Sequence, residues 1–409
     1  MTRTMQRARA LAGTVAAALF ALAASDAYAR PITLAEALGH VEDNAPLLTA
    51  AQASVRAAQA RARQAGVSPN PELDAEVENA FGTGRYSRFG GTELTVAIAQ
   101  RFERGGKRHA RMALARADLE LASISLLRTR ADIVRDIGNA FADLVAAEQK
   151  LALAQETIVR SEELARTARL MVENGRDPPL RQFRAESALA EARADAQRAR
   201  SEEEQASRAL ARLIGTPEDD LDAVGGEGPP LPDTATASGV PLTLRIAEAE
   251  RRLAEARIAL ERSAGVSDIT ARAGLRGLAE TKDVALVGGI TMPLAIRDRN
   301  RGGVEAAQAE LLAAEARMAQ ARLDSERETR DARSLLSAAQ ARLSALEGAG
   351  LTQAQEAIRV AQIGYGAGKF SLLDVFDAQA SLTSTRTSII EARRDRARAL
   401  AALERALAQ

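Results

Sequence analysis

The stretch GTELTVAIAQRFERGGKRHARMALARADLELASISLL, residues 91–127, changes its hydrophobic period midway and decides the fold. In its first part apolar side chains recur on one side of an extended chain, which predicts a β-strand: Leu94, Val96, Ile98 and Phe102. From Lys107 the apolar residues recur about every 3.5 positions, and no proline follows before Glu173. The stretch therefore predicts a strand that leads into a very long helix packed against other helices.

A second strand is expected immediately upstream, at 71–81, and its two faces differ. One face is apolar, and the other carries four carboxylates: Glu72, Asp74, Glu76 and Glu78. Four acids on one face favour a water-filled interior, so we interpret them as a lumen lining; a solvated outer surface is the alternative. The expected strands have about 9 to 11 residues each, the length that a tilted strand needs to cross a bilayer.

The chain repeats one plan twice. Gly175-Arg176 through Glu186 lines up with Gly368-Lys369 through Gln379, and RGGKR (104–108) before one long helix parallels NRGG (300–303) before another. Each repeat is expected to begin with a helix. We expect the following ranges: the first repeat at 30–224, with a strand pair at 71–102, a long helix at 107–173 and a return helix at 178–214; a Gly/Pro-rich linker at 225–241; and the second repeat at 242–409, with a strand pair at 267–293, a long helix at 301–363 and a return helix at 371–408.

The first 29 residues have the pattern of a cleaved signal peptide. Three arginines precede an apolar run over 11–24, and Ala27-Tyr28-Ala29 supplies a small-x-small cleavage site. A membrane anchor helix is the alternative, but Ser25 and Asp26 end the apolar run too early for a span. Downstream of residue 30 no 18 consecutive residues are apolar, so membrane insertion is expected through strands.

Four strands cannot close a barrel, and open strand edges are not tolerated in lipid. The chain is therefore expected to form an oligomer, and three copies supply twelve strands around an aqueous lumen. The expected fold class is mainly α with a small β part. Long antiparallel coiled-coil helices form a trimeric α-barrel, and four transmembrane strands per chain contribute to a 12-stranded β-barrel.

Composition argues against most other classes of function. The chain has no cysteine, which excludes disulfides, thiolate zinc sites and iron–sulfur clusters. Lys+Arg 55 balance Asp+Glu 55, so no basic excess indicates nucleic acid as a partner. His40 and His109 stand apart from each other and from acidic residues at ligand spacing, and no nucleophile–base arrangement is visible. We expect no enzyme, no cofactor and no metal site.

These features together resemble the TolC-type outer-membrane efflux ducts. The turn Gly105-Gly106-Lys107-Arg108 looks like the strand-to-helix element of the branch paired with cobalt-zinc-cadmium (heavy-metal RND) efflux pumps. Its counterpart in the second repeat is Met292-Pro293 with Asp298-Arg299-Asn300. Tyr365-x-x-Gly368 followed by SLLDVFDAQ (371–379) is similar to the motif at the periplasmic helix tips of these ducts.

The resemblance implies the outer-membrane channel of a tripartite efflux system in a Gram-negative bacterium. Such a channel is a passive gated homotrimer, held by outer-membrane lipid, with its helical part in the periplasm. Its partners are a periplasmic adaptor and an inner-membrane RND-type pump, and the branch implies divalent heavy-metal cations as cargo. Alternatives are an organic-toxicant or type I protein-secretion duct of the same fold, or a periplasmic coiled-coil adaptor or scaffold without a barrel.

The resemblance also implies roles for particular residues. Asp374, Asp377 and Tyr365 match positions at the periplasmic entrance, although Ser371 and Asp374 also have the spacing of a local capping box. Phe370 stands where these ducts often have a gate-linking arginine. The helix tips that would dock the adaptor are formed by Gly175, Arg176, Asp177, Gly368, Lys369, Ser371 and Leu372.

Overall fold

The computed structural model describes residues 29–40, 46–216, 220–225 and 239–409. The expected signal peptide lies outside these residues except for Ala29, and so does most of the expected linker at 225–241. In the described ranges no helix is both long enough and apolar enough to cross a membrane.

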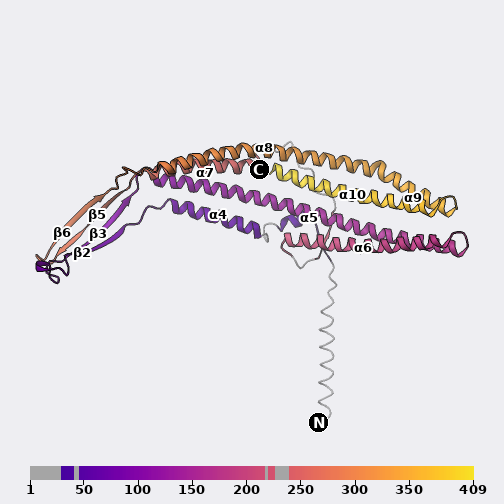
Figure 1. The fold of residues 1–409 in the computed structure, drawn as a ribbon, viewed down its shortest axis with the longest axis horizontal. Helices are drawn as coiled ribbons and strands as arrows, with labels where there is room; N and C mark the ends of the chain where they lie inside the picture. The colour runs from indigo at the N-terminus through magenta and orange to yellow at the C-terminus, as the bar shows by residue number, and fades with distance from the viewer. Residues whose placement is uncertain (1–28, 41–45, 217–219, 226–238) are drawn as a thin grey trace, which may run out of the picture. The chain divides into compact units, whose positions relative to one another are not determined.

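The chain is mainly helical with a small sheet part, as the sequence predicts (Figure 1). Its elements, in chain order, are β1 (Arg30–Ile32), α2 (Leu34–Gly39), α4 (Pro46–Ala65), β2 (Glu72–Glu78), the 3-10 turn η1 (Gly84–Tyr86), β3 (Glu93–Phe102), α5 (Lys107–Glu173), α6 (Pro179–Leu213), β4 (Leu221–Ala223), α7 (Leu242–Ala264), β5 (Ile269–Leu278), β6 (Asp283–Thr291), α8 (Arg301–Ala345), the π-helical turn η2 (Leu346–Gly350), α9 (Leu351–Gly366) and α10 (Leu372–Leu407).

The long helices begin and end where the backbone requires it. α5 runs for 67 residues without a proline, and Gly175, with φ +71°, reverses the chain two residues after it ends. The helical run from α8 to α9 is interrupted by η2, in which Gly348 has φ −77° and ψ −105°. A helix of this kind draws its stability from packing along its length, because its apolar residues are spread in a narrow seam.

The four longer strands form one antiparallel sheet in the order β2-β3-β5-β6. The two repeats meet in its centre, where β3 pairs with β5 and Ala97 lies opposite Gly274. The outer strands β2 and β6 each have one neighbour among the described strands, so one edge of each remains open. A separate parallel pair joins β1 to β4.

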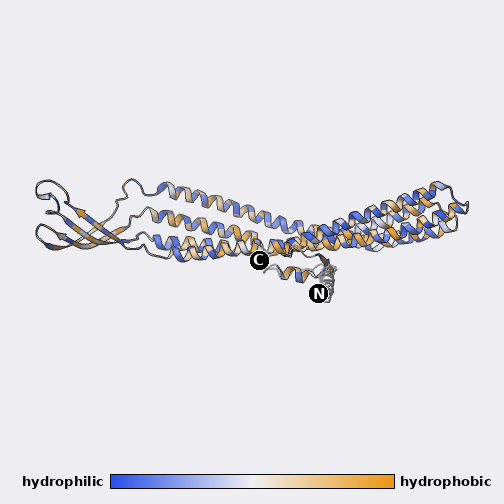
Figure 2. Cartoon of the chain, turned by 90° about the horizontal axis from the view of Figure 1, so that it is seen from below, coloured by the Kyte–Doolittle hydropathy of each residue, from blue (hydrophilic) through white to orange (hydrophobic). Residues whose placement is uncertain are grey.

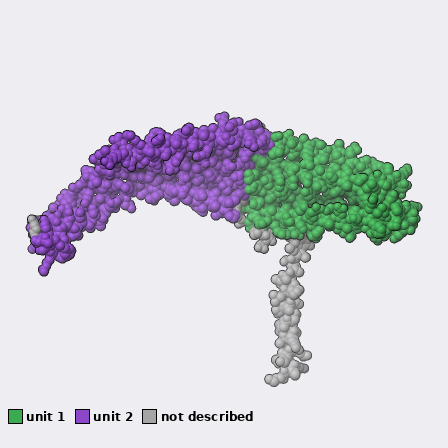
Figure 3. All heavy atoms as spheres, in the orientation of Figure 1, with its two compact units in different colours: residues 1–45, 134–231, 334–402 green, residues 46–133, 232–333, 403–409 purple. Residues whose placement is uncertain are grey.

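The chain divides into two compact units (Figure 3). Unit 1 consists of Met1–Ala45, Val134–Leu231 and Ser334–Ala402, and unit 2 of Pro46–Ile133, Pro232–Arg333 and Leu403–Gln409. The largest core in unit 1 is rich in alanine, including Ala165, Ala168 and Ala361, which allows helices to approach closely. In unit 2 a smaller cluster packs Ile124 against Leu242 and Ala249.

Ion pairs fix the order of the helices within each unit. In unit 2, Arg61 of α4 pairs with Asp118 of α5, and Arg252 of α7 pairs with Glu120 of α5. A third pair, Arg257–Glu310, joins α7 to α8. The four helices therefore lie in the order α4-α5-α7-α8. In unit 1 the corresponding order is α6-α5-α10-η2, from the following pairs: Arg193–Glu162, Arg386–Glu156 and Arg393–Glu347.

Candidate functional site

Polar and apolar residues alternate along the strands of unit 2 (Figure 2). The sheet therefore has one polar and one apolar face. On β2 the polar face carries the four expected carboxylates, Glu72, Asp74, Glu76 and Glu78, because alternate residues of a strand share a face. Their partners on β3 in the register are Ala99, Ala97, Thr95 and Glu93. The structure therefore places the predicted lining residues together in one row along an outer strand.

The opposite face of the sheet is apolar and exposed. Leu286 is 83% exposed and Leu73 is 76% exposed, although both are large aliphatic side chains. Other members of this face are Val77, Ile98, Leu275 and Ile290. Apolar area on this scale is costly in water, and it marks a surface that contacts lipid or another protein.

Two glycines shape the junction between β3 and α5. Gly105 and Gly106 have φ +66° and +73°, a region that L side chains rarely adopt. A Cβ at Gly105 would also lie 2.6 Å from the Cβ of Val266, so the chain passes too closely there for any side chain. The backbone conformation therefore explains why two consecutive glycines stand in this turn.

Charged side chains then tie this junction to the second repeat. Lys107 Nζ lies 2.8 Å from Asp268 Oδ1, and Arg104 donates its backbone N–H to the same oxygen at 3.2 Å. Within the first repeat, Arg108 Nε donates to the Gly66 carbonyl at 2.7 Å. Lys107 and Asp268 are each 19% exposed, so water screens their attraction less than it would on an open surface.

The second repeat makes its equivalent turn with an asparagine. Asn300 has φ +54°, and asparagine tolerates this region better than most residues. Its side-chain nitrogen donates to the Glu261 carbonyl at 2.9 Å and to the Glu261 carboxylate at 2.6 Å. Each long helix is thus directly preceded by one residue of positive φ, Gly106 in the first repeat and Asn300 in the second.

The two helical hairpins of unit 1 end in tips with the same backbone hydrogen bonds. Arg176 N donates to Met171 O at 2.9 Å in the first tip, and Lys369 N donates to Gly364 O at 2.8 Å in the second. Gly175 and Gly368 hold the left-handed position in each, with φ +71° and +69°. The tips are structural equivalents, in agreement with the alignment of their sequences.

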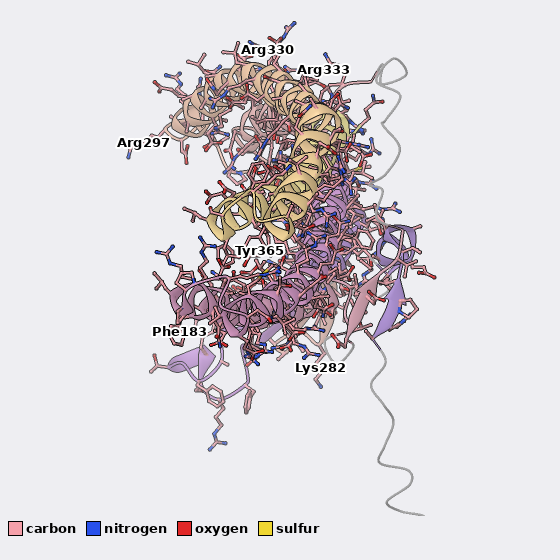
Figure 4. All side chains as sticks on the ribbon, turned by 90° about the vertical axis from the view of Figure 1, so that its right-hand side faces the viewer. Phe183, Lys282, Arg297, Arg330, Arg333 and Tyr365 are labelled. Atoms are coloured by element: carbon pink, nitrogen blue, oxygen red, sulfur yellow. The ribbon has the colours of Figure 1, made fainter. Side chains whose placement is uncertain are left out.

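A tyrosine joins one tip to the other. Tyr365 is 5% exposed, and its hydroxyl donates to Asp177 Oδ2 at 2.9 Å. Asp177 also forms an ion pair with Arg181. Figure 4 shows Tyr365 between the yellow helices α9 and α10 and the magenta helices α5 and α6. Burial, the bond to Asp177 and the charge of that carboxylate raise the pKa of Tyr365 to about 12, so the phenol stays protonated.

Asp374 caps the helix in whose first turn it lies. Ser371 donates its backbone N–H and its hydroxyl to Asp374 Oδ2, each at 2.7 Å, and Asp374 N donates back to Ser371 Oγ at 3.3 Å. These bonds from Ser371 lower the pKa of Asp374. The local capping interpretation thus has direct geometric support. Asp377 is exposed one turn further along α10.

The expected docking residues are not all at the surface. Gly175, Arg176, Gly368 and Lys369 are exposed, whereas Leu372 is 3% exposed and belongs to the helical core. The Leu372 side chain therefore supports the tip from inside. The ring of Phe370 packs over Gly364, where a Cβ would lie 2.0 Å from the ring.

Sequence reasoning missed a groove in unit 2. It has a volume of about 1120 Å³ and is lined by side chains of α4, α5, α7 and α8, together with residues near the sheet. Leu114 and Leu253 contribute apolar surface, while the pair Arg257–Glu310 lies at 3.4 Å within the lining. One groove thus contacts all four helices of unit 2.

Sequence reasoning also missed a carboxylate cluster in unit 1. Glu148 of α5 accepts a hydrogen bond from the Ala223 backbone N–H at 2.7 Å, which ties α5 to strand β4. Burial, and to a lesser degree the nearby Asp222 and Glu203, raise the pKa of Glu148 to about 7, although the bond from Ala223 N–H acts in the opposite direction. From the sequence alone no signal connects residues so far apart, because the contact depends on the β1-β4 pair.

Within the described ranges, no group of three or more His, Asp or Glu side chains is arranged to hold a metal ion. The candidate site is a set of surfaces: an amphipathic sheet with open edges, a groove lined by four helices, and two linked hairpin tips.

A β-sheet that exposes an apolar face and continues into long helical hairpins is typical of outer-membrane channel proteins. The chain belongs to the outer membrane efflux protein family, whose match covers residues 37–216 and 241–409. The protein is therefore located in the outer membrane of a Gram-negative bacterium, and its family acts in efflux.

Relatives and solved structures agree with this family. The chain is 30% identical over 366 residues to the cobalt-zinc-cadmium resistance protein CzcC of Cupriavidus metallidurans, which covers 88% of this chain and 85% of the relative. It is 31% identical over 300 residues to the nickel-cobalt-cadmium resistance protein NccC of Alcaligenes xylosoxydans xylosoxydans, covering 72% and 68%.

The fold is shared with membrane proteins of known structure. A membrane protein from Pseudomonas aeruginosa has a TM-score of 0.79 at 21% identity, covering 93% of this chain and 91% of that one. The outer membrane protein VceC from Vibrio cholerae has a TM-score of 0.76 at 22% identity, covering 92% and 96%.

Proposed function

We propose that three copies of this chain form a passive, gated channel that exports divalent heavy-metal cations across the outer membrane. The observation that carries the proposal is the sheet of unit 2, which is apolar and exposed on one face, polar on the other, and open at both edges. Lipid satisfies the apolar face, and other copies satisfy the edges.

The order of elements supports closure by identical copies. The strands run β2-β3-β5-β6 and the helices run α4-α5-α7-α8. α4 leads into the outer strand β2, and α8 follows the outer strand β6. A copy that adds its β6 to an open β2 edge therefore brings its α8 beside α4, so one interface extends both the sheet and the helical layer.

Cysteine cross-linking tests this interface. The chain has no native cysteine, so introduced pairs report only on the chosen positions. Ala75→Cys on β2 is combined in turn with Leu286→Cys, Gly288→Cys or Ile290→Cys on β6, all on the apolar face. We expect at least one combination to give trimers on a non-reducing gel, while each single variant stays monomeric; monomers throughout would contradict the proposal.

The heavy-metal cargo is supported by the relatives, which are named for resistance to cobalt, zinc, cadmium and nickel. Growth of a deletion strain on these metals and on organic toxicants tests it, with the intact gene restored as the control. We expect selective sensitivity to the metals. Sensitivity only to organic toxicants, or a defect only in protein secretion, would keep the channel and reject the metal cargo.

We infer that the hairpin tips form the periplasmic entrance and dock the adaptor of an inner-membrane RND-type pump. The tie between Tyr365 and Asp177 supports a closed arrangement of the tips, and Asp374 and Asp377 would ring the opening in a trimer. The exposed Arg176 and Lys369 offer polar contacts to an adaptor. Unchanged conductance and resistance in an Asp374→Asn, Asp377→Asn variant would reject the acidic ring.

A further inference from the structure

The polar face of the sheet is covered at its centre by arginines from the second repeat. Among all residues of β2, β3, β5 and β6, only Thr95 and Ala97 are buried, at 1% and 2% exposure. Both lie on β3, with their side chains on the polar face. Neighbouring side chains therefore cover this part of the face.

Arg272 and Arg276 of β5 form that cover. Arg276 Nε donates to Thr95 Oγ1 at 2.9 Å, and its terminal nitrogens lie 2.8 Å from Glu93 and 2.9 Å from Glu78. Arg272 lies 3.4 Å from both Asp74 and Glu76 on β2. Each arginine thus crosses the intervening strand β3 to reach carboxylates of the first repeat.

Strand β3, which lies between β2 and β5, has small side chains where the two arginines cross it. Thr95 and Ala97 stand between the acids of β2 and the arginines of β5, and both have small side chains. Opposite Ala97 lies Gly274, where a Cβ would meet the Val96 carbonyl oxygen at 2.3 Å and the Ala97 Cβ at 2.5 Å. Small residues along this path leave room for the arginine side chains to reach across β3.

The register gives the charge of the whole polar face. It carries six carboxylates, on Glu72, Asp74, Glu76, Glu78, Glu93 and Asp283, and three guanidinium groups, on Arg101, Arg272 and Arg276. Each chain therefore contributes a net −3 to this face, and Arg272 and Arg276 cancel two of the charges that the acids of the first repeat would otherwise add.

We propose that Arg272 and Arg276 set the ion selectivity of the barrel lumen, by offsetting two of the six negative charges on its polar face. This inference rests on the proposed function, because it requires the polar face to line a water-filled barrel. Rings of charged side chains select ions by sign, so the balance between the acids and these arginines determines how strongly the lumen prefers cations.

Reversal potentials in planar bilayers test the proposal. Purified full-length mature protein is inserted between unequal KCl solutions, and the permeability ratio of K⁺ to Cl⁻ is measured. The variant Arg272→Gln, Arg276→Gln changes the face from −3 to −5 per chain, and we expect the ratio to rise by about threefold, since screened charges in a water-filled lumen each act modestly.

Two matched variants separate charge from structure. Arg272→Lys, Arg276→Lys keeps the charge and is expected to keep the wild-type ratio. Adding Asp74→Asn and Glu78→Gln to the double Gln variant restores a net −3 and is expected to restore the ratio. A purely structural role for the arginines would alter assembly in the double Gln variant and leave selectivity unchanged in the channels that form.

The outcomes are distinguishable. If wild-type protein forms no channels, the proposed function fails. If channels form with normal conductance and the double Gln variant keeps the wild-type ratio, the inference about Arg272 and Arg276 is wrong. If that variant does not assemble, Asp74→Asn, Glu76→Gln tests the same balance from the other side. We then expect a lower ratio, and an unchanged one would overturn the proposal.

Discussion

Replacing Tyr365 with phenylalanine isolates the link between the two hairpin tips. The hydroxyl donates to Asp177 Oδ2 at 2.9 Å, while the ring lies in the helical core near Ala361 and Leu372. Phenylalanine keeps the ring and removes only the donor. Asp177 retains its ion pair with Arg181, so the carboxylate is not left without a partner.

The size of the effect follows from the chemistry of the bond. A hydrogen bond to a charged acceptor contributes about 1.5–3 kcal/mol, and each 1.4 kcal/mol corresponds to about tenfold in an equilibrium constant. The tips should therefore separate about 10- to 150-fold more often in Tyr365→Phe. Because the pKa of Tyr365 is raised to about 12, the phenol remains a donor across the physiological range, and the effect should not vary between about pH 6 and pH 9.

Hydrogen exchange measures this separation directly. The amides of Arg176 and Lys369 are bonded within the two tips, and their exchange should accelerate in the variant by the same factor if the tips open together. Strand amides in unit 2 should not change. Tyr86→Phe, the same substitution in the loop between β2 and β3, is the matched control. An acceleration of less than about twofold at both tips would refute the reasoning.

Two further predictions concern stability. The pKa of Glu148 is raised, mainly by burial, from 4.5 to about 7, so between these pH values the folded protein binds more protons than the unfolded chain and its stability falls as pH rises. Glu148→Gln keeps an acceptor for Ala223 N and should be more stable than wild type at pH 8, by about 1 kcal/mol after allowance for solvent screening. Near pH 4 the two proteins should be equally stable, and thermal unfolding at both pH values measures the difference. Gly105→Ala should reduce the melting temperature or yield of assembled protein far more than Gly106→Ala, because both have positive φ but only Gly105 lies against Val266; equal losses at both glycines would contradict this explanation.

Sequence periodicity predicted the mixture of long helices and a small sheet, because the change of period near residue 102 is encoded locally. The positive φ of Gly105, Gly106 and Asn300 is found only in the structure, although glycine and asparagine are the residues that tolerate it best. The pairing of β1 with β4 was missed. Each strand has three residues, and nearly two hundred residues separate them, so neither carries a period long enough to detect.

In the candidate site, too, the features encoded within one element could be predicted, whereas those that depend on tertiary contacts could not. The acidic row of β2 could be read from alternation within one strand, but its arginine partners depend on the register between β2, β3 and β5. The burial of Leu372 beside exposed neighbours likewise depends on which side of α10 faces the core. Ser371 and Asp374 carried both possible meanings in the sequence, and only the geometry shows the capping bonds.

The central claim is that identical copies complete the barrel whose open edges are β2 and β6. Native mass spectrometry of the protein extracted from outer membranes in mild detergent tests this claim most directly. The account predicts a particle of three mature chains that persists on dilution. A particle of one chain under conditions that preserve its secondary structure would contradict it, because the sheet would then keep both edges open in lipid.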